Sequence, residues 1–177
     1  TSQNRIPLVQ NGTVDIECGS TTNNTARQKD VSFAVTTYVE EVRIATKVSS
    51  GITAIGQLNG KKVATTTGTT SVQTLRKNER ATGVNFEEVF GKDHADSFLL
   101  LESGRADAFV MDGQILAGNI AKAKNPADFR IVGEVLANNT RKPLFGYRSL
   151  VYSVIFVGFM SFIVWAHHMF ITGMGTA

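Results

Sequence analysis

The sequence contains a single cysteine, Cys18, so no disulfide framework can form within the chain. Acidic residues are absent after Glu134, and no charged residue of either sign occurs between positions 149 and 177. The first 140 residues hold 15 acidic and 15 basic side chains, so three basic residues between positions 141 and 148 supply the whole net charge of +3. No basic stripe with interleaved aromatic residues accompanies the sequence pI of 9.1, so we predict no nucleic-acid partner.

The part up to residue 140 also lacks the patterns of common catalytic and metal-binding sites. No Ser-His-Asp order, metal-ligand spacing or pair of catalytic carboxylates stands out there. The glycine-containing loop 65–71 is not a P-loop, because no Gly-Lys-Ser/Thr sequence follows Gly68. These absences direct attention to binding rather than to catalysis.

The uncharged end of the chain has the composition of a membrane span. Residues 150–166 are almost wholly apolar, and the apolar character continues to Met174. A helix needs about 20 such residues to cross the core of a bilayer. The alternative is a helix buried in a soluble protein, but a helix that is apolar on every side needs a large surrounding core. We therefore predict a single C-terminal transmembrane helix over 149–177, inserted in a lipid bilayer.

The chain from residue 61 to residue 135 alternates between strand and helix patterns. The expected strands are 62–66, 84–89, 107–111 and 130–135, and the expected helices run from the turn at 68–71 to about 80, over 93–103 and over 113–123. Upstream, 13–17 and 33–48 read as extended chain and 52–58 as a short helix. Such alternation predicts an α/β fold with a mostly parallel sheet and helices on its faces.

Ligands of such sheets bind in the loops that follow the carboxyl ends of the strands. The loop 65–71 places several hydroxyl groups at the start of a helix, where backbone amides attract an anion. Simple capping of the helix by threonine or serine is an equally good reading of that loop. Asp112 follows an apolar strand, where its carboxylate can pair with an ammonium group or cap the next helix.

A second polar loop, Cys18 to Asn24, follows the first expected strand, and Arg27 comes shortly after it. Hydroxyls, amides and a bidentate guanidinium suit a carboxylate ligand, although a solvated turn with a surface arginine would have the same pattern. His94 lies between Asp93 and Asp96, and this pattern alone is more typical of an ordinary surface residue beside a helix cap than of a binding residue. Together, an arginine, two hydroxyl-rich loops and Asp112 would hold both charges of a zwitterion.

Four motifs are similar to those of one known family. They are the runs 11–24, 66–71, 92–98 and 101–106, which read NGTVDIECGSTTNN, TTGTTS, KDHADSF and LESGRA. On these motifs, residues 1 to about 136 resemble the periplasmic glutamate/aspartate-binding proteins of ABC importers, in the polar amino-acid solute-binding family. The resemblance implies a type II periplasmic-binding-protein fold, in which two α/β lobes close on an amino acid. It also implies a periplasmic location, no enzymatic activity, no cofactor, and the membrane subunits of an importer as partners.

The same resemblance implies roles for individual residues. Arg27 would bind the carboxylate of glutamate or aspartate, and Asp112 would bind its ammonium group. Arg43 and His94 would lie near the acidic side chain of the ligand, although the residues before Arg43 depart from the family pattern. The hydroxyl and amide contacts would come from Ser20, Thr21, Thr67 and Thr70. Opening strands of the family before Thr1, and the return to the first lobe after Val135, would be missing, so this segment would be about half of such a protein.

The tail resembles a different family. The runs 141–149 and 165–170, RKPLFGYRS and WAHHMF, are similar to subunit I of the haem-copper cytochrome oxidases. In that family the pair that matches His167 and His168 binds the active-site copper, and imidazole is a suitable copper ligand. The full site needs a third histidine, haem ligands and many more helices, so we expect no copper or haem site to assemble here.

These observations divide the chain into three segments. They are a truncated amino-acid solute-binding domain (1–137), a basic junction (138–148) and the hydrophobic transmembrane-type segment (149–177). Basic residues flanking a span favour the cytoplasmic side of the membrane, whereas a binding protein of this kind works outside the cytoplasm. This conflict argues against a natural membrane anchor and favours a chimera of unrelated coding fragments. The alternative function is that of a fragment of cytochrome c oxidase subunit I.

Overall fold

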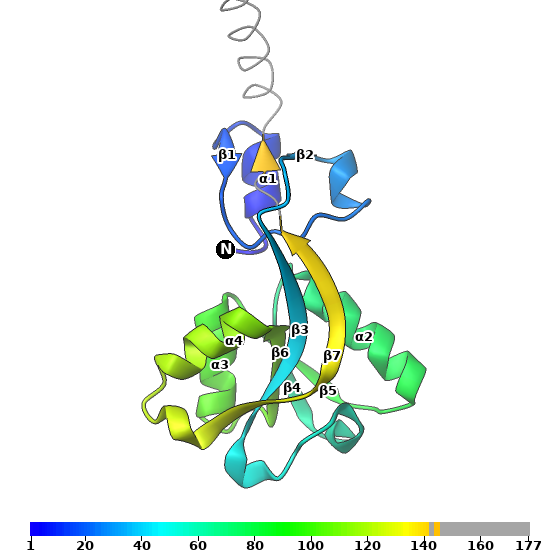
Figure 1. Ribbon diagram of the computed structural model, residues 1–177, viewed down its shortest axis with the longest axis vertical. Helices are drawn as coiled ribbons and strands as arrows, with labels where there is room; N and C mark the ends of the chain where they lie inside the picture. The colour runs from blue at the N-terminus through cyan, green and yellow to red at the C-terminus, as the bar shows by residue number, and fades with distance from the viewer. Residues whose placement is uncertain (142–143, 146–177) are drawn as a thin grey trace, which may run out of the picture.

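The computed structural model describes residues 1–141 and 144–145, which form two units joined by a pair of long strands (Figure 1). The larger unit contains a five-stranded sheet of order β5-β4-β6-β3-β7, and the smaller unit contains a three-stranded sheet of order β1-β8-β2. The strands β3 and β7 run from the larger unit up to the smaller one (Figure 1).

The elements of the larger unit occupy the middle of the chain. Its strands are β3 (Tyr38–Lys47), β4 (Lys62–Thr66), β5 (Glu87–Gly91), β6 (Ala108–Asp112) and β7 (Phe129–Arg141). Its helices are α2 (Thr70–Thr82), α3 (His94–Glu102) and α4 (Gly113–Ala121), with short 3-10 turns η2 (Val48–Ser50), η3 (Ile55–Leu58) and η4 (Pro126–Asp128). The smaller unit contains α1 (Arg5–Gln10), β1 (Ile16–Glu17), η1 (Arg27–Lys29), β2 (Ser32–Phe33) and β8 (Leu144–Phe145).

The five-stranded sheet is mixed, with one strand reversed. Strand β4 pairs in parallel with both β5 and β6, whereas β3 is antiparallel to β6 and to β7. Strand β3 brings the chain down from the smaller unit and β7 takes it back, while the strand–helix repeats between them give parallel strands. The predicted α/β class is confirmed, and β3 is the exception to a parallel sheet.

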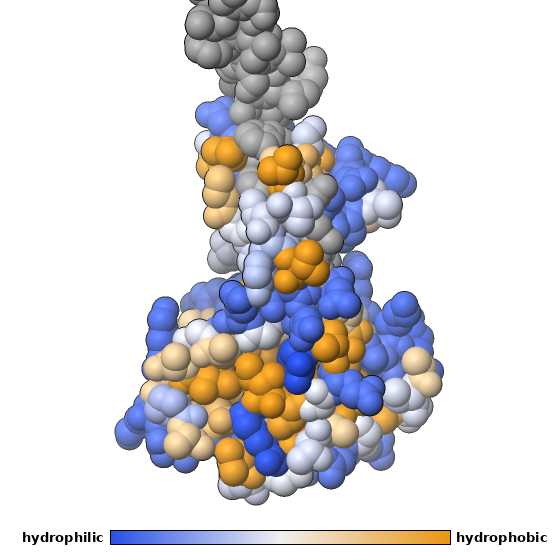
Figure 2. All heavy atoms as spheres, in the orientation of Figure 1, coloured by the Kyte–Doolittle hydropathy of each residue, from blue (hydrophilic) through white to orange (hydrophobic). Residues whose placement is uncertain are grey.

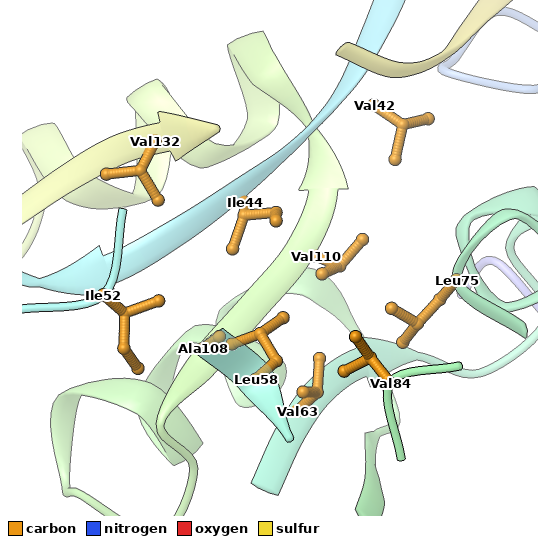
Figure 3. Close-up of a cluster of buried hydrophobic side chains, with 10 residues drawn as sticks. All are labelled: Val42, Ile44, Ile52, Leu58, Val63, Leu75, Val84, Ala108, Val110 and Val132. Atoms are coloured by element: carbon orange, nitrogen blue, oxygen red, sulfur yellow. The ribbon is translucent and has the colours of Figure 1, made fainter. Parts of the chain in front are cut away.

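The core of the larger unit lies on both faces of this sheet. Because side chains alternate along a strand, neighbouring residues of β6 enter different clusters: Val110 packs on the α2 side and Phe109 on the α3–α4 side. The cluster on the α2 side includes Leu75 of that helix (Figure 3). The opposite cluster includes Phe98 of α3 and Leu116 of α4. Burial on two faces fixes the sheet and therefore the positions at which its loops emerge.

Several boundaries differ from those expected from the sequence. Strand β5 begins at Glu87 rather than at residue 84, because α2 ends at Gly83 with φ +70° and Val84 then packs into the core. The extended run 33–48 is divided into β2 and β3, and the first strand is limited to Ile16–Glu17. Helix α1 was not expected at all.

Strand β7 continues beyond the expected domain boundary at Ala137. Its outer half pairs with the start of β3, from Glu41 opposite Asn138 to Tyr38 opposite Arg141. Strand β8 then lies in the smaller unit, between β1 and β2. The described chain therefore returns to the smaller unit, which the family resemblance had led us not to expect.

None of the helices in the described ranges is both long and apolar enough to cross a membrane. The expected transmembrane helix over 149–177 falls outside the residues that the structure describes.

Candidate functional site

The polar loop after β1 is held in place by its own side chains. Thr21 and Thr22 are buried although they are polar. The Thr21 hydroxyl donates to Oε2 of Glu17 at 2.8 Å, and the backbone amide of Arg27 donates to Oδ1 of Asn24 at 2.9 Å. The segment of residues 18–27, which we call the carboxylate loop, is thus an ordered structure rather than a solvated turn.

The guanidinium of Arg27 connects the carboxylate loop to the larger unit. Its Nη1 donates to the carbonyl of Thr22 at 3.0 Å, and its Nη2 donates to the carbonyl of Gly68 at 3.1 Å. The hydroxyls of Thr22 and Thr70 lie 3.1 Å apart across the same junction. The structure therefore brings together the two hydroxyl-rich segments that the sequence singled out.

The loop between β4 and α2 is shaped for close approach of the backbone. Gly68 has φ +78°, and a Cβ added there would lie 2.7 Å from Cα of Gln3 in the N-terminal segment. Thr69 is the N-cap residue of α2 but makes no side-chain cap hydrogen bond, and its hydroxyl donates to the Thr66 carbonyl at 2.7 Å. The Thr67 hydroxyl donates to the Gly91 carbonyl at 3.2 Å. Capping by Thr69 is thus not what this loop does, and the start of α2 retains the partial positive charge of a helix N-terminus.

Arg5 is a second cation at this site, and the sequence analysis missed it. Its Nη1 donates to the Ser20 hydroxyl at 3.3 Å, so it contacts the carboxylate loop from α1. Burial and, to a smaller extent, the charge of Arg5 lower the pKa of Arg27 to about 10, although the Glu17 carboxylate opposes both. Burial also lowers the pKa of Arg5, again opposed by Glu17. Both guanidiniums remain charged at neutral pH, so two cations and one carboxylate leave a net positive site that suits an anion.

Asp112 lies at the carboxyl end of β6 and is fully buried. It is the N-cap residue of α4, yet it makes no side-chain cap hydrogen bond to that helix. Burial of a carboxylate is costly unless a cation or hydrogen-bond donors compensate for it. Its position at the carboxyl end of a strand is suited to the ammonium group of a ligand, because ligands of such sheets bind in the loops beyond these ends.

His94 is the first residue of α3. Its Nδ1 lies 3.1 Å from the Thr66 hydroxyl, which places the ring beside the loop that precedes α2. The cap of α3 is supplied instead by Asp93, whose Oδ1 accepts from the amide of Asp96 at 2.8 Å.

Arg43 lies on β3, and its hydrogen bonds are made elsewhere. Its Nη1 donates to Oε2 of Glu41 at 3.3 Å, and its Nη2 donates to the Gly133 carbonyl at 3.0 Å. It borders a shallow hollow beside α4 that also involves Tyr38 and Gln114. The structure thus places six of the eight expected residues in or beside the two loops, Asp112 at the carboxyl end of β6, and Arg43 in contact with β3 and β7. The role of all eight residues toward a ligand stays a prediction.

The surface of the smaller unit is hydrophilic on the side that carries η1 (Figure 2). In Figure 2 the part of the smaller unit that carries η1 is covered by hydrophilic residues, whereas apolar residues gather over the larger unit. A polar, cationic loop at the junction of two units is the arrangement expected for a small charged ligand.

Comparison with known proteins decides the family. Residues 1–139 match the model of the bacterial extracellular solute-binding proteins, family 3. The chain belongs to this family. It is 52% identical over 134 residues to the glutamate/aspartate import solute-binding protein of Escherichia coli, a match that covers 76% of this chain and 44% of the relative. It is 50% identical over 133 residues to the L-glutamate/L-aspartate-binding protein of Pseudomonas aeruginosa, covering 75% of this chain and 44% of that protein.

Solved structures of related proteins share the fold of this family 3 chain. An ancestral arginine-binding protein bound to arginine superposes with a TM-score of 0.72 at 27% identity, covering 82% of this chain and 63% of that one. A periplasmic binding protein from Brucella ovis with glutathione bound gives a TM-score of 0.78 at 23% identity, covering 82% of this chain and 47% of that one. The family 3 chain spans less than half the length of the curated relatives it matches.

The end of the chain is similar to another family, as its motifs indicated. Residues 126–177 match the model of cytochrome c and quinol oxidase polypeptide I. Over 47 residues the chain is 51% identical to cytochrome c oxidase subunit 1 of Bacillus subtilis, covering 27% of this chain and 8% of that protein. His167 and His168 lie outside the described residues. Within residues 1–141 and 144–145, no cluster of three or more histidine, cysteine, aspartate or glutamate residues could hold a metal ion.

Proposed function

We propose that this chain carries the acidic-amino-acid-binding part, in truncated form, of the solute-binding component of an ABC amino-acid importer. The observation that carries the proposal is that Arg27 contacts both hydroxyl-rich loops, one of them at the start of α2, while Arg5 contacts the carboxylate loop. The proposed ligands are glutamate and aspartate, the solutes named for the relatives from Escherichia coli and Pseudomonas aeruginosa. The proposed location is the periplasm, and the membrane subunits of the importer are the proposed partners.

In this proposal Arg27 binds the α-carboxylate of the amino acid. The guanidinium fork matches a carboxylate in two parallel hydrogen bonds, which are stronger than those between neutral groups. Arg5 adds a second positive charge, and the amides at the start of α2 add a partial one. The hydroxyl and amide contacts come from Ser20, Thr21, Thr67 and Thr70.

The ammonium group and the acidic side chain of the ligand are bound by protein groups of opposite charge. Asp112, at the carboxyl end of β6, binds the ammonium group. His94, beside Thr66, contacts the acidic side chain of the ligand. Arg43 is the second proposed partner of that side chain. No bond is made or broken in this process, so the proposed activity is binding and not catalysis, and it requires no cofactor.

Isothermal titration calorimetry of the full chain with glutamate and with aspartate tests this proposal. We expect the Arg27→Ala and Asp112→Ala variants to weaken binding by about 2–5 kcal/mol each, since each leaves a buried charge without its partner. Arg76→Ala is the matched control, because Arg76 pairs with Glu88 on the exposed surface and away from the loops. Unchanged affinity in the Arg27 variant, with a folded circular dichroism spectrum, would refute the ligand assignment.

We further propose that the chain is a chimera whose C-terminal segment, inserted in a lipid bilayer, derives from an oxidase. The separate family matches to residues 1–139 and 126–177 support this reading. Sequencing the gene and its transcript across positions 137–143 in the source genome tests it. A single uninterrupted reading frame, reproduced in the transcript, would contradict the chimera.

A second candidate function is that of a fragment of haem-copper cytochrome c oxidase subunit I, favoured by the oxidase match at the end of the chain. It requires His167 and His168 to ligate copper. Copper titration with a spectroscopic readout distinguishes the two functions. Stoichiometric tight binding that disappears in a His167→Ala variant would support the oxidase function, and we expect no such binding.

A further inference from the structure

Strand β8 occupies the centre of the small sheet. It is antiparallel to β1, with Ile16 opposite Phe145 and Glu17 opposite Leu144. It is also antiparallel to β2, with Ser32 opposite Phe145 and Phe33 opposite Leu144. The order β1-β8-β2 means that the two outer strands pair with β8 and not with each other.

This central strand does not come from the solute-binding part of the sequence. The family 3 match ends at residue 139, whereas the oxidase match runs from residue 126 to residue 177. Leu144–Phe145 therefore belongs to the segment that only the oxidase model covers. Residues that only the oxidase model matches thus complete a sheet whose other strands lie in the family 3 match.

The two outer strands flank the carboxylate loop. Strand β1 ends at Glu17, directly before the loop, and β2 begins at Ser32, shortly after η1. The amide of Val31 donates to the carbonyl of Arg27 at 3.1 Å, which links the end of η1 to the start of β2. Pairing with β8 thus holds both ends of the segment that carries Arg27.

Glu17 links this sheet directly to the charges of the site. Its backbone lies opposite Leu144, while its side chain accepts a hydrogen bond from the Thr21 hydroxyl at 2.8 Å. The same carboxylate acts electrostatically on Arg5 and on Arg27. A displacement of β1 would therefore move a negative charge that acts on both arginines.

We propose that Leu144–Phe145 is a positioning strand for the carboxylate loop, so that ligand affinity depends on residues outside the solute-binding sequence. The expected effect on ligand affinity rests on the proposed function. The expected effect of β8 on the order of the carboxylate loop does not. Strands of two residues have too few contacts to persist without a partner. Removal of the shared central strand would release both ends of the loop together.

Proline substitutions in β8 test the proposal, because proline cannot donate a hydrogen bond to a neighbouring strand. Leu144→Pro and Phe145→Pro each remove one amide from the central strand, and Leu144→Ala is the matched control that keeps the amide. The full 177-residue chain is purified in detergent micelles and studied by hydrogen–deuterium exchange and by glutamate calorimetry. We expect amides of residues 14–33 to exchange about tenfold faster or more in the proline variants, with β4 and β6 unchanged. We expect glutamate affinity to fall about tenfold or more in the same variants and to stay near the parent value in Leu144→Ala.

The two readouts separate failure of this inference from failure of the proposed function. If the parent chain binds no glutamate, the proposed function fails, and the exchange rates of residues 14–33 still decide whether β8 positions the loop. Unchanged exchange in both proline variants overturns the inference. If a proline variant unfolds the larger unit as well, the double variant Leu144→Gly with Phe145→Gly replaces it, because glycine weakens a strand while keeping its amides. Unchanged loop exchange in that double variant also overturns the inference.

Discussion

The two units of this chain are stabilised in different ways. The larger unit buries two apolar clusters, one on each face of a five-stranded sheet. The smaller unit buries only Val9 and Val31 among the apolar residues described there, with Ile6 and Phe33 packed against them. Its two-residue strands and its arginines contribute few apolar contacts. The larger unit is thus a well-packed scaffold that carries the loop between β4 and α2. The smaller unit has little apolar core and carries the carboxylate loop.

This difference has a physical consequence for the site. Residues that come from the larger unit, such as Asp112 and Thr70, are positioned by packed strands and helices. Residues from the smaller unit, such as Arg27 and Ser20, are positioned by hydrogen bonds and charges. Changes in the core should therefore alter stability, and changes at the junction should alter binding.

The largest expected effect breaks the scaffold. Phe109→Ala removes a fully buried ring from the centre of β6 and should lower the free energy of unfolding by about 3–5 kcal/mol. Urea denaturation followed by circular dichroism measures it. Phe90→Ala is the control, since Phe90 is 47% exposed on the edge strand β5. Equal losses in both variants would show that the two-faced core is not what holds the larger unit together.

An intermediate effect is expected from a substitution that weakens the contact between Gly68 and the N-terminal segment. Gly68→Ala places a methyl group 2.7 Å from Cα of Gln3 and requires a non-glycine residue at φ +78°. Backbone strain and the clash together should cost about 2–4 kcal/mol of the contact between the N-terminal segment and α2. Exchange rates of residues 1–10 and glutamate affinity measure it.

Gly83→Ala is the matched control for that prediction. Gly83 has φ +70°, and no atom lies within 4 Å of an added Cβ, so it carries the backbone strain without the clash. If both variants lose the same free energy of unfolding and keep ligand affinity, the close approach of Gln3 has no role in holding the units together.

The smallest expected effect concerns a single hydrogen bond in the carboxylate loop. Thr21→Val removes the donor to Glu17 from a buried position and should cost about 1 kcal/mol of loop stability. Glutamate affinity should fall by a comparable amount, because Glu17 is then freer to move relative to Arg5 and Arg27. Thr25→Val, at an exposed position of the same loop, is the control. A larger effect at Thr25 than at Thr21 would contradict the role given to Glu17.

The sequence predicts the larger unit well because its signals are local. Strand β4 was expected at its observed residues, and α3 and α4 were expected within two residues of their ends, since each combines a periodic pattern with a turn or cap nearby. Gly104 and Asp93 mark the two ends of α3 in this way.

The smaller unit was harder to predict because its structure depends on distant partners. Helix α1 has six residues and no side-chain cap, so no periodic pattern indicates it, and Arg5 looked like any surface arginine. Strand β8 has two residues, and its partners β1 and β2 lie far earlier in the chain. Loop chemistry did indicate Arg27 and Asp112 as candidates, because charged residues after strands are informative even where the strands themselves are short.

The irregularity in the β3–β7 pair has a mechanical consequence. The register shifts between Val42 and Ile44, so β7 pairs with β3 over Phe129–Val132 and again over Ala137–Arg141, with Gly133 and its neighbours looping out between. Strand β3 stays paired with β6 across this gap, with Val42 opposite Asp112 and Arg43 opposite Met111, so the interruption lies in β7 alone. Beyond Val42 only β7, of the described strands, accompanies β3, from Glu41 opposite Asn138 to Tyr38 opposite Arg141, so a bend in this two-stranded ribbon would move the smaller unit without breaking any pair between β3 and β6.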